Sequence, residues 1–245
     1  MKKIVLIALT LIMSLSAQAY TLVIDAGHGG KDPGAIGRKS KEKNINLAVA
    51  LAFGKLVEQN CPDVKVIYTR KTDVFVELDE RANIANRNKA DLFVSIHVNS
   101  TAAKSGPQGT ETYTLGMHRA ADNLEVAKRE NSVITLESNY EQKYEGFDPK
   151  SSESYIIFEL MQDKNMEQSV NFAKLVQQQF KSTAGRVNKG VYQAGFLVLR
   201  ATSMPSALIE LGYINNVSEE AYLMSAAGQS AMAKSIYNAF KAYKK

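Results

Sequence analysis

The amino-acid sequence predicts an α/β fold in which a sheet of about six strands, mostly parallel or mixed, is flanked by helices on both faces. Short runs of apolar and β-branched residues, typical of buried strands, alternate along the chain with longer stretches whose apolar residues recur at a helical spacing. Such alternation is typical of sheets that helices cover on both sides. Apolar residues make up 45% of the 245 residues, which is enough for a large core.

The elements can be assigned in order along the chain. Between the first two strands, apolar residues from Ile45 to Leu56 indicate a helix, and Ser40 is a candidate cap for it. The stretch from Gly116 to Glu167 is polar and lacks strand alternation, so we expect a partly helical insertion at about residues 117–166. The predicted strands cover residues 21–25, 64–69, 91–97, 110–115, 196–199 and 207–211. Further helices are predicted at residues 78–89 and 120–131, from about residue 152 to Phe180, and from Met232 to Tyr243.

The N-terminal segment predicts export. Lys2 and Lys3 precede an apolar run and then a small-residue Ala-Gln-Ala site, the pattern of a secretory signal peptide. We therefore expect residues 1–19 to be removed, a single domain over residues 20–245, and a periplasmic location. The apolar run is shorter than the roughly 20 residues that cross a bilayer, so no membrane span is expected.

Composition excludes several classes of function. Removal of Lys2 and Lys3 lowers the formal charge from +5 to +3, and no basic run interleaved with aromatic residues occurs, so we expect no nucleic-acid binding. The glycine-rich segment after residue 25 does not match a phosphate-binding loop, because no Ser or Thr follows Lys31. A single cysteine, Cys61, can form no intramolecular disulfide, so stability must come from an ordinary core.

Only three histidines occur, and two of them directly follow apolar runs. His28 and His97 are therefore expected at strand ends, where clefts open in α/β sheets. Imidazole is the commonest metal ligand, so this placement calls for a further ligand nearby. Glycines on both sides of His28 leave its side chain room to face a ligand. His118 has no patterned neighbours, and we interpret it as a surface residue.

Glu42 is a candidate third ligand. It lies where the first helix is expected to begin, near the same sheet edge as His28. A carboxylate in the first helical turn is also favoured by the helix dipole, by about 0.3–1 kcal/mol, which is a purely structural explanation. Two imidazoles and one carboxylate, however, are the ligands of the open zinc site of many hydrolases. The combination of His28, Glu42 and His97 therefore indicates a metal site.

Glu210 stands inside an otherwise apolar predicted strand. Burial of an unpaired carboxylate costs several kcal/mol, so a structural explanation needs a partner such as Arg200. The functional alternative is a general base beside a metal-activated water.

Four motifs together resemble those of the zinc-dependent N-acetylmuramoyl-L-alanine amidases of the cell-separation type. The resemblance extends from about Leu22 to the C-terminus, with the motifs in order. They are IDAGHGG around His28, KEKN around Glu42, SIHVN around His97 and IELG around Glu210.

The resemblance implies that His28, Glu42 and His97 hold Zn²⁺, that Glu210 is the catalytic carboxylate, and that Arg200 lies near the substrate cleft. The implied reaction is hydrolysis of the amide between N-acetylmuramic acid and L-alanine in peptidoglycan, for wall remodelling and daughter-cell separation. Glu210 would take a proton from water and pass it to the departing amine, while zinc and Arg200 stabilise the oxyanion.

The resemblance also gives the insertion a candidate role. Some relatives carry a helix here that covers the active site, contributes a carboxylate to zinc, and keeps the enzyme latent until an activator protein binds. The alternative is a loop that only shapes the substrate site. We expect a monomer. The candidate carboxylates are Glu125, Glu130, Glu137, Glu141 and Glu145.

Two other functions stay open. One is a zinc exopeptidase acting on stem peptides, because related folds use similar ligands. The other is a wall-binding protein without catalysis, which the presence of all four site residues disfavours.

Overall fold

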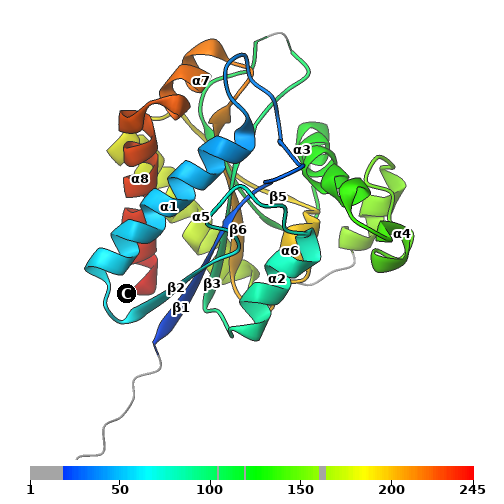
Figure 1. Cartoon of the computed structure of the whole chain (residues 1–245), viewed down its shortest axis with the longest axis horizontal. Helices are drawn as coiled ribbons and strands as arrows, with labels where there is room; N and C mark the ends of the chain where they lie inside the picture. Colours follow the sequence, from blue (N-terminus) through cyan, green and yellow to red (C-terminus); the bar gives the residue numbers. More distant parts are fainter. Residues whose placement is uncertain (1–18, 104, 119, 160–163) are drawn as a thin grey trace, which may run out of the picture.

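A computed structural model describes residues 19–103, 105–118, 120–159 and 164–245 of the chain (Figure 1). The predicted signal peptide lies almost wholly outside the described residues. Within the described part, no helix is both long and apolar enough to cross a membrane.

Six strands form one mixed sheet in the order β2-β1-β3-β6-β4-β5. The first four strands of that order run parallel to one another. β4 runs antiparallel to β6 and parallel to β5, so the last two strands point the other way. This confirms the predicted fold class. The strands are β1 (Tyr20–Ala26), β2 (Val64–Tyr68), β3 (Leu92–Asn99), β4 (Thr110–Leu115), β5 (Asn188–Ala194) and β6 (Ser206–Tyr213).

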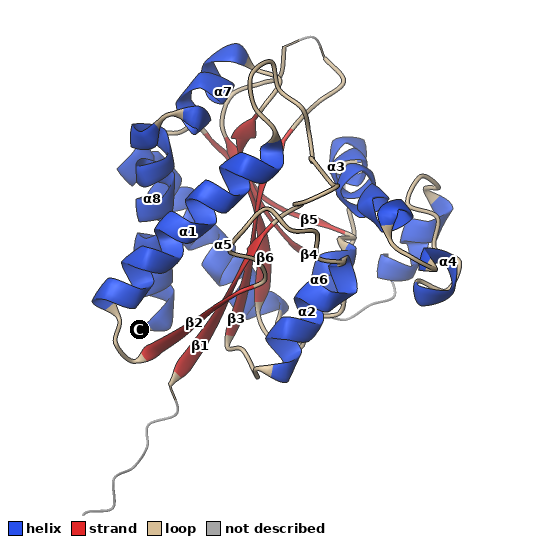
Figure 2. Ribbon diagram, in the orientation of Figure 1, coloured by secondary structure: helices blue, strands red, loops and turns tan. Residues whose placement is uncertain are grey.

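Helices cover both faces of the sheet, as Figure 2 shows. On one face α1 (Glu42–Asn60), α5 (Met166–Ala184), α7 (Val217–Met224) and α8 (Ala226–Lys244) enclose a core that includes Leu22, Ile24 and Ile209. On the other face α2 (Leu78–Arg87), α6 (Leu197–Arg200) and the insertion enclose a second core around Val23, Phe93 and Leu208. Alternate residues of β1 thus point to opposite cores, as pleating requires.

The insertion between β4 and α5 is a chain of short helical pieces. It consists of α3 (Ala121–Asn131), a 3₁₀ turn η1 (Ser132–Leu136), α4 (Tyr140–Lys143) and a second 3₁₀ turn η2 (Glu153–Glu159). The helix predicted at residues 120–131 is confirmed. The helix predicted from about residue 152 to Phe180 is wrong in its first part, because η2 and α5 are separate elements and a turn at residues 164–165 precedes α5.

One predicted strand is wrong and one strand was not predicted. Residues 196–199 lie in and next to the helical turn α6, which packs on α2; a short apolar run does not distinguish a buried strand from a buried helical turn. β5 went unpredicted because it is a half-exposed edge strand with polar residues and a glycine, so it has no apolar run. Ser40 does not cap α1: Lys41 is the N-cap residue, and the Ser40 hydroxyl donates to Glu220 instead.

The parallel strands determine which edge of the sheet carries the candidate site residues. Because β1, β3 and β6 run in the same direction, their C-terminal ends meet at one edge of the sheet. His28 follows β1 by two residues, and His97 on β3 is the register partner of Glu210 on β6. α1 begins with Glu42 at the same edge.

Candidate metal and active site

His28 lies in a left-handed backbone conformation, with φ +61°. Such a conformation is uncommon outside glycine and persists where the surroundings hold it. Here the buried Arg81 guanidinium donates to the His28 carbonyl at 2.9 Å and to the Ala26 carbonyl at 2.8 Å. Gly27 leaves space for His97, because a Cβ at Gly27 would lie 2.3 Å from the His97 ring. The sequence around residue 27 therefore brings the two imidazoles together.

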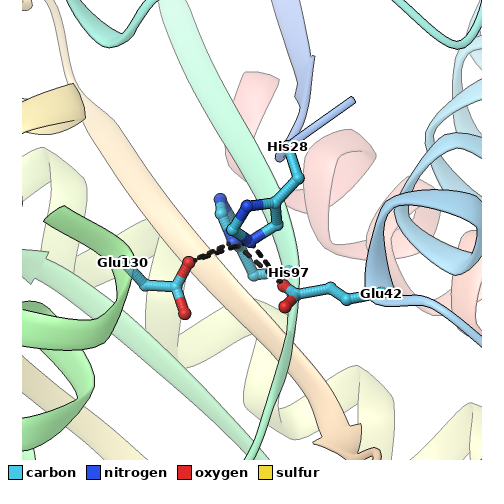
Figure 3. Close-up of side chains that lie close together, drawn as sticks. All are labelled: His28, Glu42, His97 and Glu130. Atoms are coloured by element: carbon cyan, nitrogen blue, oxygen red, sulfur yellow. Dashed lines mark hydrogen bonds and ion pairs between the residues drawn. The ribbon is translucent and has the colours of Figure 1, made fainter. Parts of the chain in front are cut away.

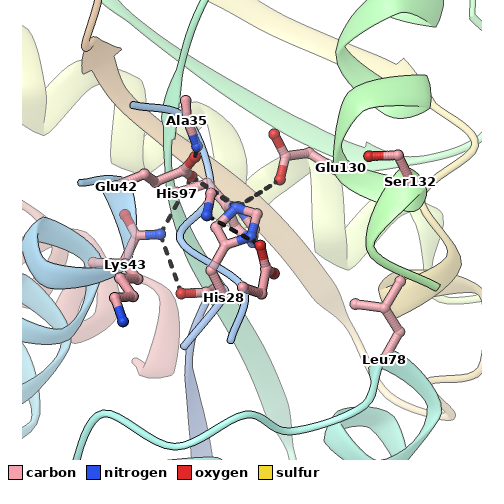
Figure 4. Close-up of polar contacts among 12 residues, drawn as sticks. His28, Ala35, Glu42, Lys43, Leu78, His97, Glu130 and Ser132 are labelled. Carbon is pink, nitrogen blue, oxygen red and sulfur yellow. Dashed lines mark hydrogen bonds and ion pairs between the residues drawn. The ribbon is translucent and has the colours of Figure 1, made fainter. Parts of the chain in front are cut away.

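Glu42 is fully buried, although it is the first residue of a helix. One carboxylate oxygen accepts from the Ala35 backbone N–H at 2.8 Å (Figure 4). The other accepts from the Val98 N–H at 2.9 Å. A solvated first-turn carboxylate, the structural alternative, does not describe this environment, because the side chain is oriented inward and held by two neighbouring segments.

Four buried side chains converge at this edge: His28, Glu42, His97 and Glu130 of α3 (Figure 3). His28 Nε2 lies 3.1 Å from Glu42 Oε1 and 3.1 Å from Glu130 Oε2. His97 Nδ1 lies 3.2 Å and 2.9 Å from the same two oxygens. Glu130 is one of the five insertion carboxylates that the sequence offered.

This arrangement fits a zinc ion. Nitrogen and oxygen ligands at about 2.0–2.1 Å from a tetrahedral Zn²⁺ are about 3.3 Å from one another, close to the spacing found here. His28 Nε2 and Glu130 Oε2 are buried, and although they lie close to one another, neither makes a hydrogen bond of good geometry with the described residues. Buried polar atoms are rarely left unsatisfied, so a cation at their centre accounts for both.

The second nitrogen of His28 has its own carboxylate. Asp32 Oδ2 lies 2.6 Å from His28 Nδ1, and Asp32 also accepts from the Gly34 N–H at 3.0 Å. A carboxylate on the far ring nitrogen fixes the imidazole tautomer and orientation, and it is a common partner of zinc-binding histidines. Asp32 was not predicted as a site residue.

The carboxylates of the cluster strongly affect the pKa values of its two histidines. Burial alone would lower the pKa of His97, but Glu130 and Glu42 raise it to about 9. Burial likewise opposes a charged His28, yet Glu42, Asp32 and Glu130 raise its pKa well above the usual value. Without a metal, the imidazoles therefore hold protons between two carboxylates. A divalent cation would replace those protons.

Glu210 is 1% exposed and lies beside the cluster. Its Oε1 is 3.5 Å from Arg129 Nη2, and its buried Oε2 has no hydrogen-bond partner among the described residues. Burial and the neighbouring Glu130 raise the pKa of Glu210 well above its ordinary range, and Arg129 opposes this. A carboxyl of this kind can take up a proton and release it.

Arg200 is not brought to the cluster. It is the last residue of α6, and its side chain makes no hydrogen bond or ion pair with His28, Glu42, His97, Glu130 or Glu210 among the described contacts. The guanidinium beside Glu210 is that of Arg129. The suggested role of Arg200 stays a prediction. His118, interpreted from the sequence as a surface residue, is half-buried after β4 and lies outside the cluster.

Two cavities flank the cluster. The metal-side cavity, of about 370 Å³, is lined by His28, Glu42 and the start of η1. The β4–β5 cavity, of about 570 Å³, is lined by Glu111, Lys189 and Tyr213 together with residues of α3. Arg129 lines both cavities, so α3 stands between them.

The side chains that converge at this edge indicate the class of protein. Two imidazoles and two carboxylates, beside a further buried carboxylate, are the chemical equipment of metal-dependent hydrolases. Residues 22–242 match the Amidase_3 family, described as N-acetylmuramoyl-L-alanine amidase. The chain therefore belongs to this family, and N-acetylmuramoyl-L-alanine amidase is its enzyme class.

Individual relatives agree with the family. The chain is 34% identical over 232 residues to the amidase AmiC of Escherichia coli O6:H1, covering 91% of this chain but only 52% of AmiC. The catalytic domain of the amidase CwlV from Paenibacillus polymyxa superposes with a TM-score of 0.68 at 31% identity, covering 92% of this chain and 98% of that domain. The CwlD amidase of Clostridioides difficile, solved in complex with the GerS lipoprotein, gives 0.63 at 25% identity, covering 92% and 98%.

Proposed function

We propose that the protein is a zinc-dependent hydrolase that cleaves the amide between N-acetylmuramic acid and L-alanine in peptidoglycan. The observation that carries zinc is the convergence of His28 Nε2, His97 Nδ1, Glu42 Oε1 and Glu130 Oε2, two of which have no other partner. When bound, zinc supplies Lewis acidity, which polarises the scissile carbonyl and makes water more acidic. His28, Glu42 and His97 are the residues that would hold it during turnover.

Glu210 performs the proton transfers in this proposal. Its carboxylate takes the proton of the attacking water and gives it to the nitrogen of the departing L-alanine, so that the amine leaves neutral. Burial suits this role because the raised pKa of Glu210 brings proton uptake and release closer to neutral pH.

We further propose that the described conformation is latent. Catalytic zinc sites keep one coordination position open, whereas four protein ligands close a site. Glu130 would be the fourth ligand of a bound zinc, and the adjacent Arg129 lies 2.8 Å from Glu130 Oε1 and 3.5 Å from the Glu210 carboxylate. Two consecutive residues of α3 therefore block both the place of the substrate carbonyl and the general base.

The cellular role follows from these proposals. We propose that the protein is exported to the periplasm, acts in daughter-cell separation, and is activated by a protein that displaces α3. The CwlD structure supports a protein partner for this family, since that amidase was solved with a lipoprotein bound. The alternative of a substrate-shaping insertion predicts instead that removal of α3 lowers activity.

The experiment is mass spectrometry of soluble products after purified peptidoglycan is incubated with zinc and either the native mature chain or a chain lacking Ala121–Pro149. Peptides with a free L-alanine amino terminus, released faster by the deletion variant, are expected. Cleavage within the stem peptide would show the exopeptidase instead. If neither the native chain nor a folded deletion variant, both loaded with zinc, releases such peptides, the amidase proposal is overturned.

A further inference from the structure

We propose that the β4–β5 cavity is the subsite for the peptide that leaves in the reaction, and that Lys189 binds a carboxylate of that peptide. The inference rests on the proposed amidase function and deepens it by naming which cavity takes which half of the substrate. It is argued from the position of Glu210, the strand register, and the charges in the cavity.

The position of Glu210 sets the direction of the substrate. The group that protonates the departing nitrogen must lie on the leaving-group side of the scissile amide. Glu210 pairs in register with Glu111 on β4, and Glu111 lines the β4–β5 cavity together with Tyr213, three residues after Glu210 on β6. The metal-side cavity opens from His28 and Glu42 instead. The peptide therefore extends into the β4–β5 cavity, and the sugar into the metal-side cavity.

A β-bulge turns Lys189 toward this cavity. Thr110 pairs with Asn188 and Glu111 with Gly190, so Lys189 is the extra residue of β5. Bulges re-aim side chains and are frequent beside active sites. The Lys189 ammonium lies 3.2 Å from Glu111 Oε1 and 4.8 Å from the centroid of the Tyr213 ring.

Glu111 positions the Lys189 ammonium but does not use all of its N–H donors. The Glu111 carboxylate also accepts from Asn99 at 2.9 Å, from the Tyr113 hydroxyl at 2.9 Å and from the Tyr213 hydroxyl at 2.7 Å. An ammonium has three donors, and the Lys189 side chain is 28% exposed, so donors remain for a ligand. The other described cation of the cavity wall, Arg129, already donates to Glu130 and to the Ser100 carbonyl.

The distance fits the second residue of the peptide. Glu111, which contacts the Lys189 ammonium, pairs with Glu210 one strand spacing away, about 5 Å. Two extended residues span at most about 7 Å, so a carboxylate on the second residue of the peptide reaches the ammonium. The preferred ligand is therefore a peptide that begins with L-alanine and carries a carboxylate on its second residue.

The test uses two probes that differ only in charge: L-alanyl-D-glutamate and its diamide, L-alanyl-D-glutamine amide. Each is titrated into the isotope-labelled native chain and followed by NMR, because the cavity is open while α3 is in place. We expect the acid to bind about tenfold more tightly than the diamide. Its largest amide shifts should fall at Gly190 and Thr101 rather than at Ala35 in the metal-side cavity.

Variants of Lys189 sharpen the test. Lys189→Gln should reduce the preference for the acid to less than about twofold, and Lys189→Arg should keep it, because the charge remains. Lys65→Gln, an exposed lysine on the opposite edge strand, is the matched control and should change nothing. Equal affinity of the two probes for the native chain, or shifts centred on Ala35, would overturn the assignment.

The outcomes separate this inference from the amidase proposal. If the activated chain releases L-alanyl peptides but the probes do not discriminate, the subsite is wrong and the function stands. If the probes bind at Gly190 with the expected charge preference and no peptide is released from peptidoglycan, the cleaved bond is wrong and the cavity remains a peptide site.

Discussion

A network of buried hydrogen bonds around Asp25 holds the side chains of the site in position. Asp25 is fully buried and accepts from Arg81 at 2.8 Å, from Thr69 at 2.6 Å and from Ser95 at 2.6 Å. Arg81 in turn donates to the His28 carbonyl. A buried, fully paired carboxylate thus supports the left-handed conformation of His28, which places its imidazole against His97.

Loss of the Asp25 charge should weaken the fold in a pH-dependent way. Arg81, Ser95 and Thr69 outweigh burial and hold the pKa of Asp25 below its ordinary 3.8. The ionised carboxylate therefore stabilises the fold above that pH, and this contribution is lost as the pH falls through the lowered pKa. Asp25→Asn should cost about 3–5 kcal/mol at pH 7, because it leaves Arg81 buried without its partner.

Chemical denaturation between pH 2.5 and 7 measures this effect. The difference in unfolding free energy between the native chain and Asp25→Asn should shrink as the pH falls. Asp63→Asn is the control, since Asp63 pairs with Lys244 at the exposed surface and its loss should leave the free energy of unfolding nearly unchanged. A difference for Asp25→Asn that stays constant to pH 2.5 would contradict the charge argument.

Glu210→Gln should separate catalysis from metal binding. The amide keeps the shape of the side chain but cannot accept and return a proton, so turnover should fall by about 10²–10⁴-fold. Zinc content should be unchanged, because Glu210 is not among the four converging side chains. Product release is compared in the chain lacking Ala121–Pro149, where latency is removed. Wild-type turnover by a correctly folded variant would exclude the role.

At the scale of elements, α3 is the helix on which the proposed latency depends. Its inner face carries Val126, Ala127 and Glu130, whereas Glu125 points outward and its side chain is 69% exposed. The insertion is further attached to α2 by Glu137, which accepts from the Leu78 N–H at 2.8 Å. Displacement of α3 therefore has to break a charged contact at the cluster and a helix-terminal contact at α2.

Glu130→Ala should activate the enzyme. Removal of the fourth ligand opens a coordination position and frees one partner of Arg129, so activity on peptidoglycan should rise by about 5–150-fold, the usual range of a regulatory coupling. Glu141→Ala, at an exposed carboxylate of the same insertion that lines neither cavity beside the cluster, is the matched control and should leave activity unchanged. A Glu130→Ala variant that binds zinc and is less active than the native chain would indicate a substrate-shaping helix.

The elements also show what the sequence could predict. Five strands and α1, α2 and α8 follow from apolar periodicity, because their cores are large and regular, whereas α3 was predicted only as a helix within a polar stretch. α6 and β5 did not follow, since tertiary contacts decide a short apolar run and an edge strand needs no buried face. His28, Glu42 and His97 were found from strand and helix ends. Glu130 could have been singled out because it follows Val126 by four residues and Ala127 by three, on the apolar face of its helix.

Some site residues carried no sequence signal. Arg129 precedes Glu130 in a polar stretch, and nothing in that stretch indicates that its guanidinium lies beside Glu210 rather than in solvent. Arg200 was expected near the substrate cleft from the family resemblance, but which guanidinium lies beside Glu210 depends on how the insertion folds back over the sheet. Contacts between distant segments are set by topology, which local periodicity does not encode.

For the whole molecule, metal removal should lower stability. The ligands come from β1–α1, α1, β3 and α3, so a bound ion links both faces of the sheet. At a zinc concentration 100 times the Kd, binding stabilises a fold by about 2.7 kcal/mol, which for a chain of this size raises Tm by about 5–10 °C. A chelator should remove that increment in a thermal melt.

Histidine variants provide the controls for this melt. His118→Ala should keep the full zinc-dependent shift, whereas His97→Ala should lose it, because only His97 belongs to the cluster. An equal response of both variants to zinc would place the metal elsewhere.

Glu130 belongs both to the helix that the proposed partner displaces and to the four side chains that could hold a metal. Whatever free energy its carboxylate contributes to holding a metal is the same free energy that keeps α3 closed, and linkage of this kind is reciprocal. A partner that lifts α3 weakens zinc affinity by the factor by which zinc weakens the partner's affinity. If the proposed latency holds, zinc supply would act as a second input to the enzyme, because scarce zinc would make it easier for the partner to open α3 and abundant zinc would make it harder.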